Sequence, residues 1–174
     1  MKKTYIISTI CLLLLVIFAC LNFSIIGVTK NNLERNARKS QKIDDSWQVS
    51  KSVTDTLGVL LFYKEDSNDF TYSIYLNREG FSFGYFFHSG GSSIDISKGI
   101  QAFNYGNSIA IVSINKVNAA RIECVSEDSQ KQELIYTLEP GKPFAIAVPI
   151  ADDNTTIRIY DKDGNEIPIT TMSC

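Results

Sequence analysis

The chain contains a single histidine, His88, and the residues that follow it are of the types found in a Ser-His-Asp hydrolase site. Ser89, Ser92, Ser93 and Asp95 all lie within seven residues of it. The partners of a catalytic triad seldom come from one short stretch, and the G-x-S-x-G turn that presents the serine of many hydrolases is absent. We therefore expect His88 to end a strand before a glycine loop, and we predict no catalytic residue and no enzyme activity.

Acidic residues at 161–166 have a superficial likeness to a calcium loop. With Asp161 as first ligand, such a loop needs glycine at its sixth position and glutamate at its twelfth, where this chain has Glu166 and Met172. A second acidic pair, Asp152 and Asp153, is separated from it by a strand of about 17 to 20 Å. One histidine and four cysteines also leave little material for a His/Cys site. The sequence predicts no metal, no cofactor and an Asp-Gly hairpin turn at 161–166.

Two cysteines lie in the C-terminal half of the chain. Cys124 alternates with Arg121 and Glu123, which predicts that it is a small buried residue. Cys174 is the last residue. In an oxidising compartment Cys124 and Cys174 could form a disulfide that fastens the C-terminal tail, but the required geometry does not follow from the sequence.

Aromatic residues are concentrated between positions 62 and 87. Most of them fall on the inward side of an alternating pattern, which is typical of a core. Tyr75 and Phe86 instead fall on the same side of the alternation as the polar residues. If their strands are neighbours, these two rings form an exposed patch that could bind a partner protein or a glycan, although a covering loop would explain them equally well.

Strands are indicated by the two-residue period of the apolar residues after Leu57. Two runs have this period most clearly: Phe70, Tyr72, Ile74 and Leu76, then Phe81, Phe83, Tyr85 and Phe87. We expect both sets to face the core, with a hairpin connection at residues 78–80. Further strands are expected at 58–64, 109–114, 119–125, 133–138, 144–150 and 156–160.

About eight short strands separated by turn residues predict an all-β fold for residues 47–174. No long segment after residue 50 has the helical period. The expected architecture is an immunoglobulin-like or jelly-roll-like β-sandwich, preceded by one N-terminal transmembrane helix.

That helix is predicted from residues 5–28, which follow a short basic N-terminus at 1–4 and contain no charged side chain. As a helix they would span roughly 36 Å, more than the roughly 30 Å of a bilayer core. Neither Cys20 nor Ser24 is preceded by the small residues of a good signal-peptidase site. We therefore expect an uncut anchor in the cell membrane.

A lipoprotein signal is the alternative. Ile17-Phe18-Ala19-Cys20 resembles the lipobox of bacterial lipoproteins, in which the cysteine is lipidated. Phe18 departs from the small or β-branched residue usual at its position, and the chain stays apolar after Cys20. The resemblance covers four residues and implies possible lipidation at Cys20.

Residues 29–46 are polar and basic, and we expect a solvated juxtamembrane linker. Residues 1–46 carry seven Lys or Arg against three Asp or Glu, whereas residues 47–174 carry ten against sixteen, a net charge of −6. The basic residues after the apolar segment favour a cytoplasmic domain. The order of a short basic start and an apolar run favours the outside, which we prefer.

The acidic domain makes nucleic acid an unfavourable partner, because nucleic-acid binding depends on Lys and Arg. We therefore predict a single-pass membrane protein of the bacterial cell envelope whose extracytoplasmic β-sandwich is a non-enzymatic binding or accessory module. Its partners would be the lipid bilayer, through residues 5–28, and another envelope protein or a glycan. A cytoplasm-facing regulatory domain is the alternative, and an envelope hydrolase is the least favoured.

Overall fold

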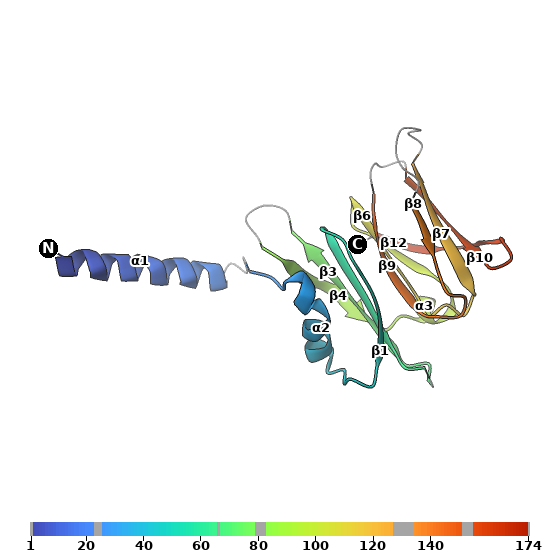
Figure 1. The fold of residues 1–174 in the computed structure, drawn as a ribbon, viewed down its shortest axis with the longest axis horizontal. Coiled ribbons are helices and arrows are strands. Elements are labelled where there is room, and N and C mark those ends of the chain that lie inside the picture. Colours follow the sequence, from blue (N-terminus) through green and yellow to red (C-terminus); the bar gives the residue numbers. More distant parts are fainter. Residues whose placement is uncertain are drawn as a thin grey trace.

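The computed structural model describes residues 2–22, 26–65, 67–78, 83–126, 134–150 and 155–173, and strands dominate it (Figure 1). Its helices are α1 (Lys2–Asn22), α2 (Leu33–Gln41) and α3 (Ile94–Lys98), with a short 3₁₀ helix, η1 (Lys30–Asn32), before α2. The prediction of a β-rich domain is confirmed. Seven of the observed strands, β2, β3, β6, β7, β8, β9 and β10, match expected ranges to within one or two residues, because strong period-two segments are the part of a β fold that sequence specifies best. Strand β4 begins four residues later than the expected run 81–87, and β1, β5, β11 and β12 were not predicted.

The described strands form three four-stranded sheets. Sheet I has the order β1 (Gln48–Val53), β2 (Leu57–Tyr63), β3 (Phe70–Asn77), β4 (Tyr85–Gly91). Sheet II has the order β12 (Thr170–Ser173), β5 (Gln101–Asn104), β6 (Ser108–Ser113), β9 (Phe144–Pro149). Sheet III has the order β11 (Glu166–Ile167), β10 (Thr155–Asp161), β7 (Ala119–Ser126), β8 (Leu134–Thr137). Neighbouring strands are antiparallel except β12 and β5, which are parallel.

Sheet II lies between the other two and is buried on both faces. In β6, Ala110 and Val112 join a cluster with sheet I, whereas Ile111 joins a cluster with sheet III. In β9, Ala145 and Ala147 face sheet I while their neighbours along the strand face sheet III. A strand with two buried faces has a continuous apolar sequence, as in Phe144–Pro149. The structure is thus consistent with the predicted all-β sandwich, and its described strands form three stacked sheets.

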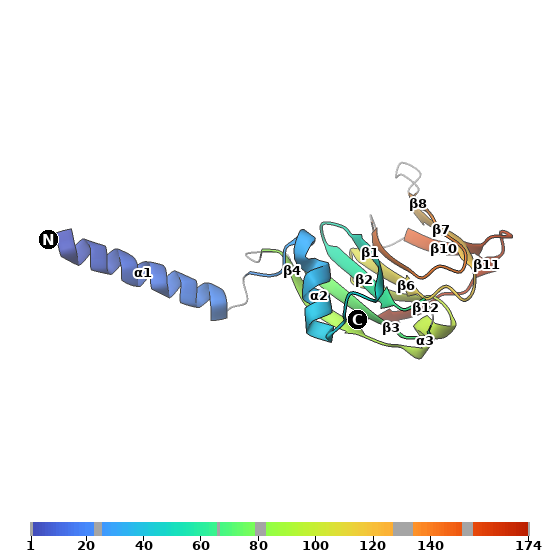
Figure 2. The same ribbon diagram turned by 60° about the horizontal axis from the view of Figure 1, so that its bottom comes forward.

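Helix α2 covers the outer face of sheet I and adds a further layer (Figure 2). Leu33 and Ala37 are completely buried in a cluster with Leu60 and Phe62 of β2. A Cβ atom on Gly58 would lie 3.0 Å from Leu33 Cδ1, so the glycine lets the helix approach the sheet. The prediction of a solvated linker over residues 29–46 is wrong. A helix of nine residues needs only a few apolar side chains on one face to dock, and here Leu33 and Ala37 are enough despite the polar composition of the segment.

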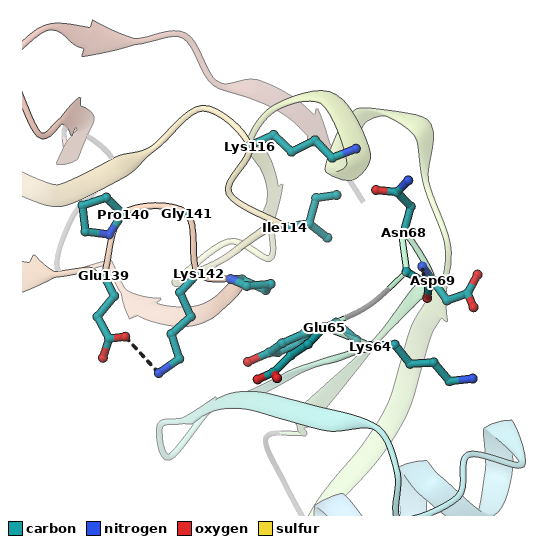
Figure 3. Close-up of a pocket in the computed structure, with 13 residues that line it drawn as sticks. Lys64, Glu65, Asn68, Asp69, Ile114, Lys116, Glu139, Pro140, Gly141 and Lys142 are labelled. Carbon is teal, nitrogen blue, oxygen red and sulfur yellow. Dashed lines mark hydrogen bonds and ion pairs between the residues drawn. The ribbon is translucent and has the colours of Figure 1, made fainter.

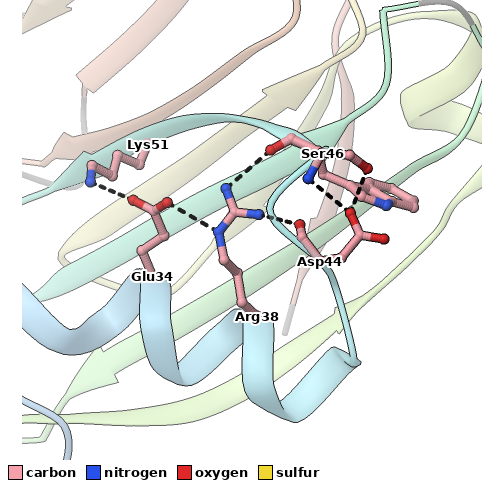
Figure 4. Close-up of polar contacts among 6 residues, drawn as sticks. Glu34, Arg38, Asp44, Ser46 and Lys51 are labelled. Atoms are coloured by element: carbon pink, nitrogen blue, oxygen red, sulfur yellow. Dashed lines mark hydrogen bonds and ion pairs between the residues drawn. The ribbon is translucent and has the colours of Figure 1, made fainter.

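The charged face of α2 is itself held against the body by Arg38 (Figure 4). Arg38 Nε donates to Glu34 at 3.2 Å, and its two Nη atoms donate to the carbonyl oxygens of Asp44 and Trp47 at 2.8 and 3.1 Å. Lys51 Nζ of β1 donates to the other Glu34 oxygen at 2.6 Å. The hydrogen bond from Lys51, together with Arg38, lowers the pKa of Glu34 against the opposing effect of burial. These contacts join the helix to β1 and to the connection between them.

The register of β4 reverses the faces that alternation predicts. A bulge falls between the Ile74–Ser89 and Tyr75–Phe87 pairs, so Phe87 lies opposite Tyr75 on the α2 side of sheet I. Phe86 lies opposite Leu76 on the other side. Phe83, expected in the core, is 69% exposed, and Phe87 is 52% exposed. A one-residue bulge changes the face of the side chains on one side of it, here Phe86 and Phe87, and the period alone cannot reveal it. Phe83 lies before β4, where it forms a bridge with Ile26.

Helix α1 extends away from the sheets in both views (Figures 1 and 2). Ile26 and Val28 lie beyond it and form isolated bridges with Phe83 and Tyr85, so the end of the predicted segment 5–28 belongs to the folded body. Within the residues that the structure describes, no helix combines the length and the apolar character needed to cross a membrane.

Replacing Leu33 by alanine tests the docking of α2. Truncation of a completely buried leucine should lower the free energy of unfolding by about 2 to 5 kcal/mol. Urea unfolding of the detergent-solubilised chain, followed by the fluorescence of Trp47, measures the change. Ile135→Ala is the control, because Ile135 is 57% exposed and its truncation should cost little. Equal effects of the two variants would contradict the packing of α2.

Candidate functional site

A cleft of about 530 Å³ lies where three connections meet (Figure 3). It is lined by the β2–β3 connection, by Ile114 and Lys116 after β6, and by residues 139–143 before β9. The β2–β3 connection leads into Phe70 at one end of β3, whereas Val28 and Tyr85 pair beside Asn77 at the other end. Eight residues of β3 span about 27 Å. The cleft and the attachment of α1 are therefore at opposite ends of sheet I.

Short hydrogen-bonded turns give the β2–β3 connection its shape. Lys64 N donates to the carbonyl oxygen of Asp69 at 3.1 Å, which closes the connection at its base. Ser67 Oγ accepts a hydrogen bond from Asp69 N at 3.1 Å. Such side-chain-to-backbone bonds are typical of Ser and Asp in turns. They leave the side chain of Asn68 exposed at the cleft.

Asn115 joins the other two connections to each other. Its side chain is completely buried, and its backbone has a φ of +58°. Asn115 Nδ2 donates to the carbonyl oxygens of Ala119 and Glu139, each at 3.1 Å, and Asn115 Oδ1 accepts from Ala119 N at 2.7 Å. One amide thus satisfies backbone groups of both connections. Asn115 is a positioning residue, since it fixes both walls without lining the cleft.

Side chains of both charge signs surround the cleft. Lys64, Lys116 and Lys142 come from its three walls, and Glu65, Asp69 and Glu139 stand among them. Lys142 Nζ donates to Glu139 Oε2 at 3.0 Å, and this hydrogen bond raises the pKa of Lys142.

Lys64 Nζ lies 5.1 Å from the centroid of the Trp47 ring. At the base of the cleft, burial raises the pKa of the Tyr63 hydroxyl. The mixed charge suits a polar partner that offers groups of both signs.

The predicted aromatic patch does not exist. Tyr75 is 1% exposed, lies beneath α2 and donates a hydrogen bond from its hydroxyl to Asn36 Oδ1 at 2.9 Å. Burial raises its pKa to about 12. Phe86 is half-buried on the opposite face of the sheet, with the Arg78 guanidinium 4.5 Å from its ring centroid. The period assigned Tyr75 to a solvent face because it could not show that α2 covers that face.

His88 and the acidic hairpin lie apart from the cleft. The His88 ring packs edge-on against Tyr105 at 5.1 Å, and no serine or carboxylate is hydrogen-bonded to it in the part of the chain described. Asp161 accepts hydrogen bonds from Asp163 N and Asn165 N, each at 2.8 Å, inside the β10–β11 hairpin, which confirms the predicted turn. These bonds and one from the Asn165 side chain lower the pKa of Asp161. Across the described ranges no group of three or more His, Cys, Asp or Glu is placed to hold a metal ion.

The cysteine predictions have separate outcomes. Cys124 is buried, as expected, in the cluster between sheets II and III, and burial raises its pKa to about 11. Its thiol is free in the structure. Cys174, its proposed disulfide partner, lies outside the described residues. Cys20 falls within α1, but the structure does not describe its side chain.

Sequence reasoning missed the cleft. It identified the connections at 65–69 and 139–142 as turns, but nothing in the sequence indicates that they converge. Asn115 and Asn118, both with a φ near +57°, were the one local signal, because asparagine tolerates left-handed backbone in turns.

Asn115→Ala tests how the cleft is held. The substitution removes the hydrogen bonds from Asn115 to both connections and takes the acceptor away from the buried Ala119 N–H, which should cost about 1 to 3 kcal/mol of unfolding free energy. Exchange of the amide hydrogens of Glu139, Gly141 and Lys142 should accelerate. Asn118→Ala is the control, because Asn118 shares the left-handed backbone but is exposed. Unchanged exchange in the Asn115 variant would show that this side chain does not hold the walls.

Comparison with known proteins identifies no relative of this chain. No protein-family model matches the chain, and no match is found among the curated proteins or the solved structures that were compared with it. The function is therefore argued from the residues and their placement alone.

Proposed function

We propose that the chain is a membrane-anchored, extracytoplasmic binding or accessory module of the bacterial cell envelope, without enzymatic activity. The observation that carries the proposal is the solvent exposure of the apolar side chains of α1. Its large apolar side chains from Tyr5 to Phe18 are 46% to 69% exposed, on every side of the helix. No residue of α1 belongs to the hydrophobic clusters of the described residues.

A helix whose apolar side chains are this exposed in the described part of the chain is favoured by an apolar environment. Exposed hydrocarbon costs about 25 cal/mol for each Å² that remains in water, and lipid removes that cost. Helical backbone also satisfies its own hydrogen bonds, as a bilayer demands. We propose that α1 inserts in the membrane from Tyr5 onward and that the folded body begins at Ile26.

The position of the cleft supports a binding role. With α1 attached at one end of sheet I, the cleft at the other end would face away from the membrane, where another envelope protein or a glycan could reach it. His88, the best candidate for catalysis, lies outside this cleft and packs on Tyr105. We therefore propose partner binding at the cleft in place of the predicted patch of Tyr75 and Phe86.

A cytoplasm-facing regulatory domain is the second candidate, and one observation favours it. Lys30, Arg35, Arg38 and Lys39 follow the apolar segment, and basic residues beside a membrane span tend to stay in the cytoplasm. A topology reporter fused after Cys174 separates the two candidates. Reporter activity outside the cytoplasm supports the first, and activity inside the cytoplasm supports the second.

Retention in the membrane is the direct test of the anchor. The intact chain should remain in the membrane fraction through a carbonate wash, because α1 would be held by its apolar surface and not by charge. Cys20→Ser is the matched variant, and it should be retained equally. Loss of retention in Cys20→Ser, together with the loss of a lipid-sized mass from the parent protein, would replace the anchor by a lipoprotein signal.

Photo-cross-linking in intact cells tests the cleft. A photoreactive residue in place of Lys116 should capture a specific partner, since Lys116 is exposed at the cleft. Arg158 is the matched control, an exposed basic residue on β10 that does not line the cleft. No adduct from position 116, or the same adduct from both positions, would contradict binding at the cleft.

A further inference from the structure

The chain just after α1 is fastened to the start of β4. Gly27 N donates to the Phe83 carbonyl oxygen at 2.7 Å, and Val28 and Tyr85 exchange two backbone hydrogen bonds of 2.8 Å each. Two glycines permit this close contact. A Cβ atom on Gly27 would lie 2.6 Å from Tyr85 O, and one on Gly84, where φ is +91°, would lie 2.8 Å from Val28 O.

This attachment limits how far the domain can stand from α1. Helix α1 ends at Asn22, and Ile26 is already paired with Phe83. Four residues of fully extended chain cover at most roughly 14 Å. The polar headgroup layer of a bilayer is about 5 to 8 Å deep on each side. If α1 is in lipid, the start of β4 therefore lies at or near the headgroups.

The two side chains at this place are apolar and exposed. Ile26 is 68% exposed and Phe83 is 69% exposed, and the bridge between them puts the two residues side by side. Neither belongs to a hydrophobic cluster of the described residues. A large aliphatic and an aromatic side chain together on a water-facing surface are costly, whereas the membrane interface accepts both.

The surrounding charge also suits a membrane surface. Lys30 follows the attachment directly, and Arg35 lies on the first turn of α2, where it donates to Asn32. Arg78 follows the end of β3 and lies over the Phe86 ring. Among the described residues, the acidic side chains of this region include Asp55 in the β1–β2 turn and Glu34 on the first turn of α2, which is paired with Arg38 and Lys51. Each basic side chain near an anionic surface contributes about 1 kcal/mol of attraction.

We infer that Ile26 and Phe83 insert in the headgroup region of an anionic phospholipid bilayer beside α1, so that this end of sheet I rests on the membrane. The inference rests on the proposed function, because it requires α1 to be in the bilayer. The contact would fix the orientation of sheet I relative to the bilayer, with the cleft at the end of the sheet that is farther from the lipid.

Tryptophan placed at these positions reports on the contact. The full-length chain would be reconstituted in vesicles of phosphatidylcholine and phosphatidylglycerol with bromine on the acyl chains near the headgroups. Trp47, the single native tryptophan, supplies the baseline signal. Phe83→Trp and Ile26→Trp should each add emission that is blue-shifted and quenched by the brominated lipid. Ile94→Trp is the matched control, because Ile94 is also 69% exposed but lies beyond the other end of β4, and its emission should be neither shifted nor quenched.

Flotation of the same vesicles distinguishes a failure of the proposed anchor from a failure of the proposed lipid contact alone. If the chain floats with the vesicles and the tryptophans at positions 26 and 83 behave as the one at 94, the anchor stands and the inference is overturned. If the chain does not float, the anchor fails, and the inference fails with it. Quenching at 26 and 83 but not at 94, in floated vesicles, supports the contact.

Discussion

Strand β2 is the constraint on which the other layers depend. All seven of its residues are buried, because Leu57, Val59 and Leu61 face sheet II while Leu60 and Phe62 face α2. Each such side chain contributes roughly 1.5 to 3 kcal/mol by leaving water. One short strand thus joins the helix next to α1 to the stacked sheets. A shift of β2 by one residue in its register would exchange its two faces. The side chains that pack on sheet II and those that pack on α2 would then lose these contacts.

The two ends of sheet I have different neighbours. Hydrogen bonds at Gly27 and Val28 set one end of sheet I beside α1, and the β2–β3 connection sets the other end beside the cleft. Rigid β structure between them keeps the two ends about one strand length apart. The proposed anchor, the proposed contact with lipid and the proposed binding cleft are consistent with one another for this reason. The anchor and the lipid contact are at one end of sheet I, and the cleft is at the other.

Buried polar groups have a positioning role in this fold. Asn115 satisfies backbone groups of two connections, and Tyr75 donates to Asn36 across the α2 interface. A buried polar side chain adds little net stability when it is paired, but losing its partner is costly. Such groups therefore define one arrangement of loops and helix among the many that apolar packing would tolerate. The cleft depends on this kind of bond more than on hydrophobic contact.

The sequence by itself determined the positions of most of the longer strands, the Asp161 hairpin and the apolar start of the chain, because period, turn residues and composition act over a few neighbouring residues. Only the tertiary structure decided which faces were buried. Tyr75 was assigned to solvent because the pattern could not show that α2 covers it. Phe83 was assigned to the core, but it lies before β4 beside Ile26 and is exposed. The cleft likewise needs three connections that are distant in the chain. Side-chain period records that a residue alternates, but the layer that meets each face is set by contacts between distant segments, which the local pattern does not encode.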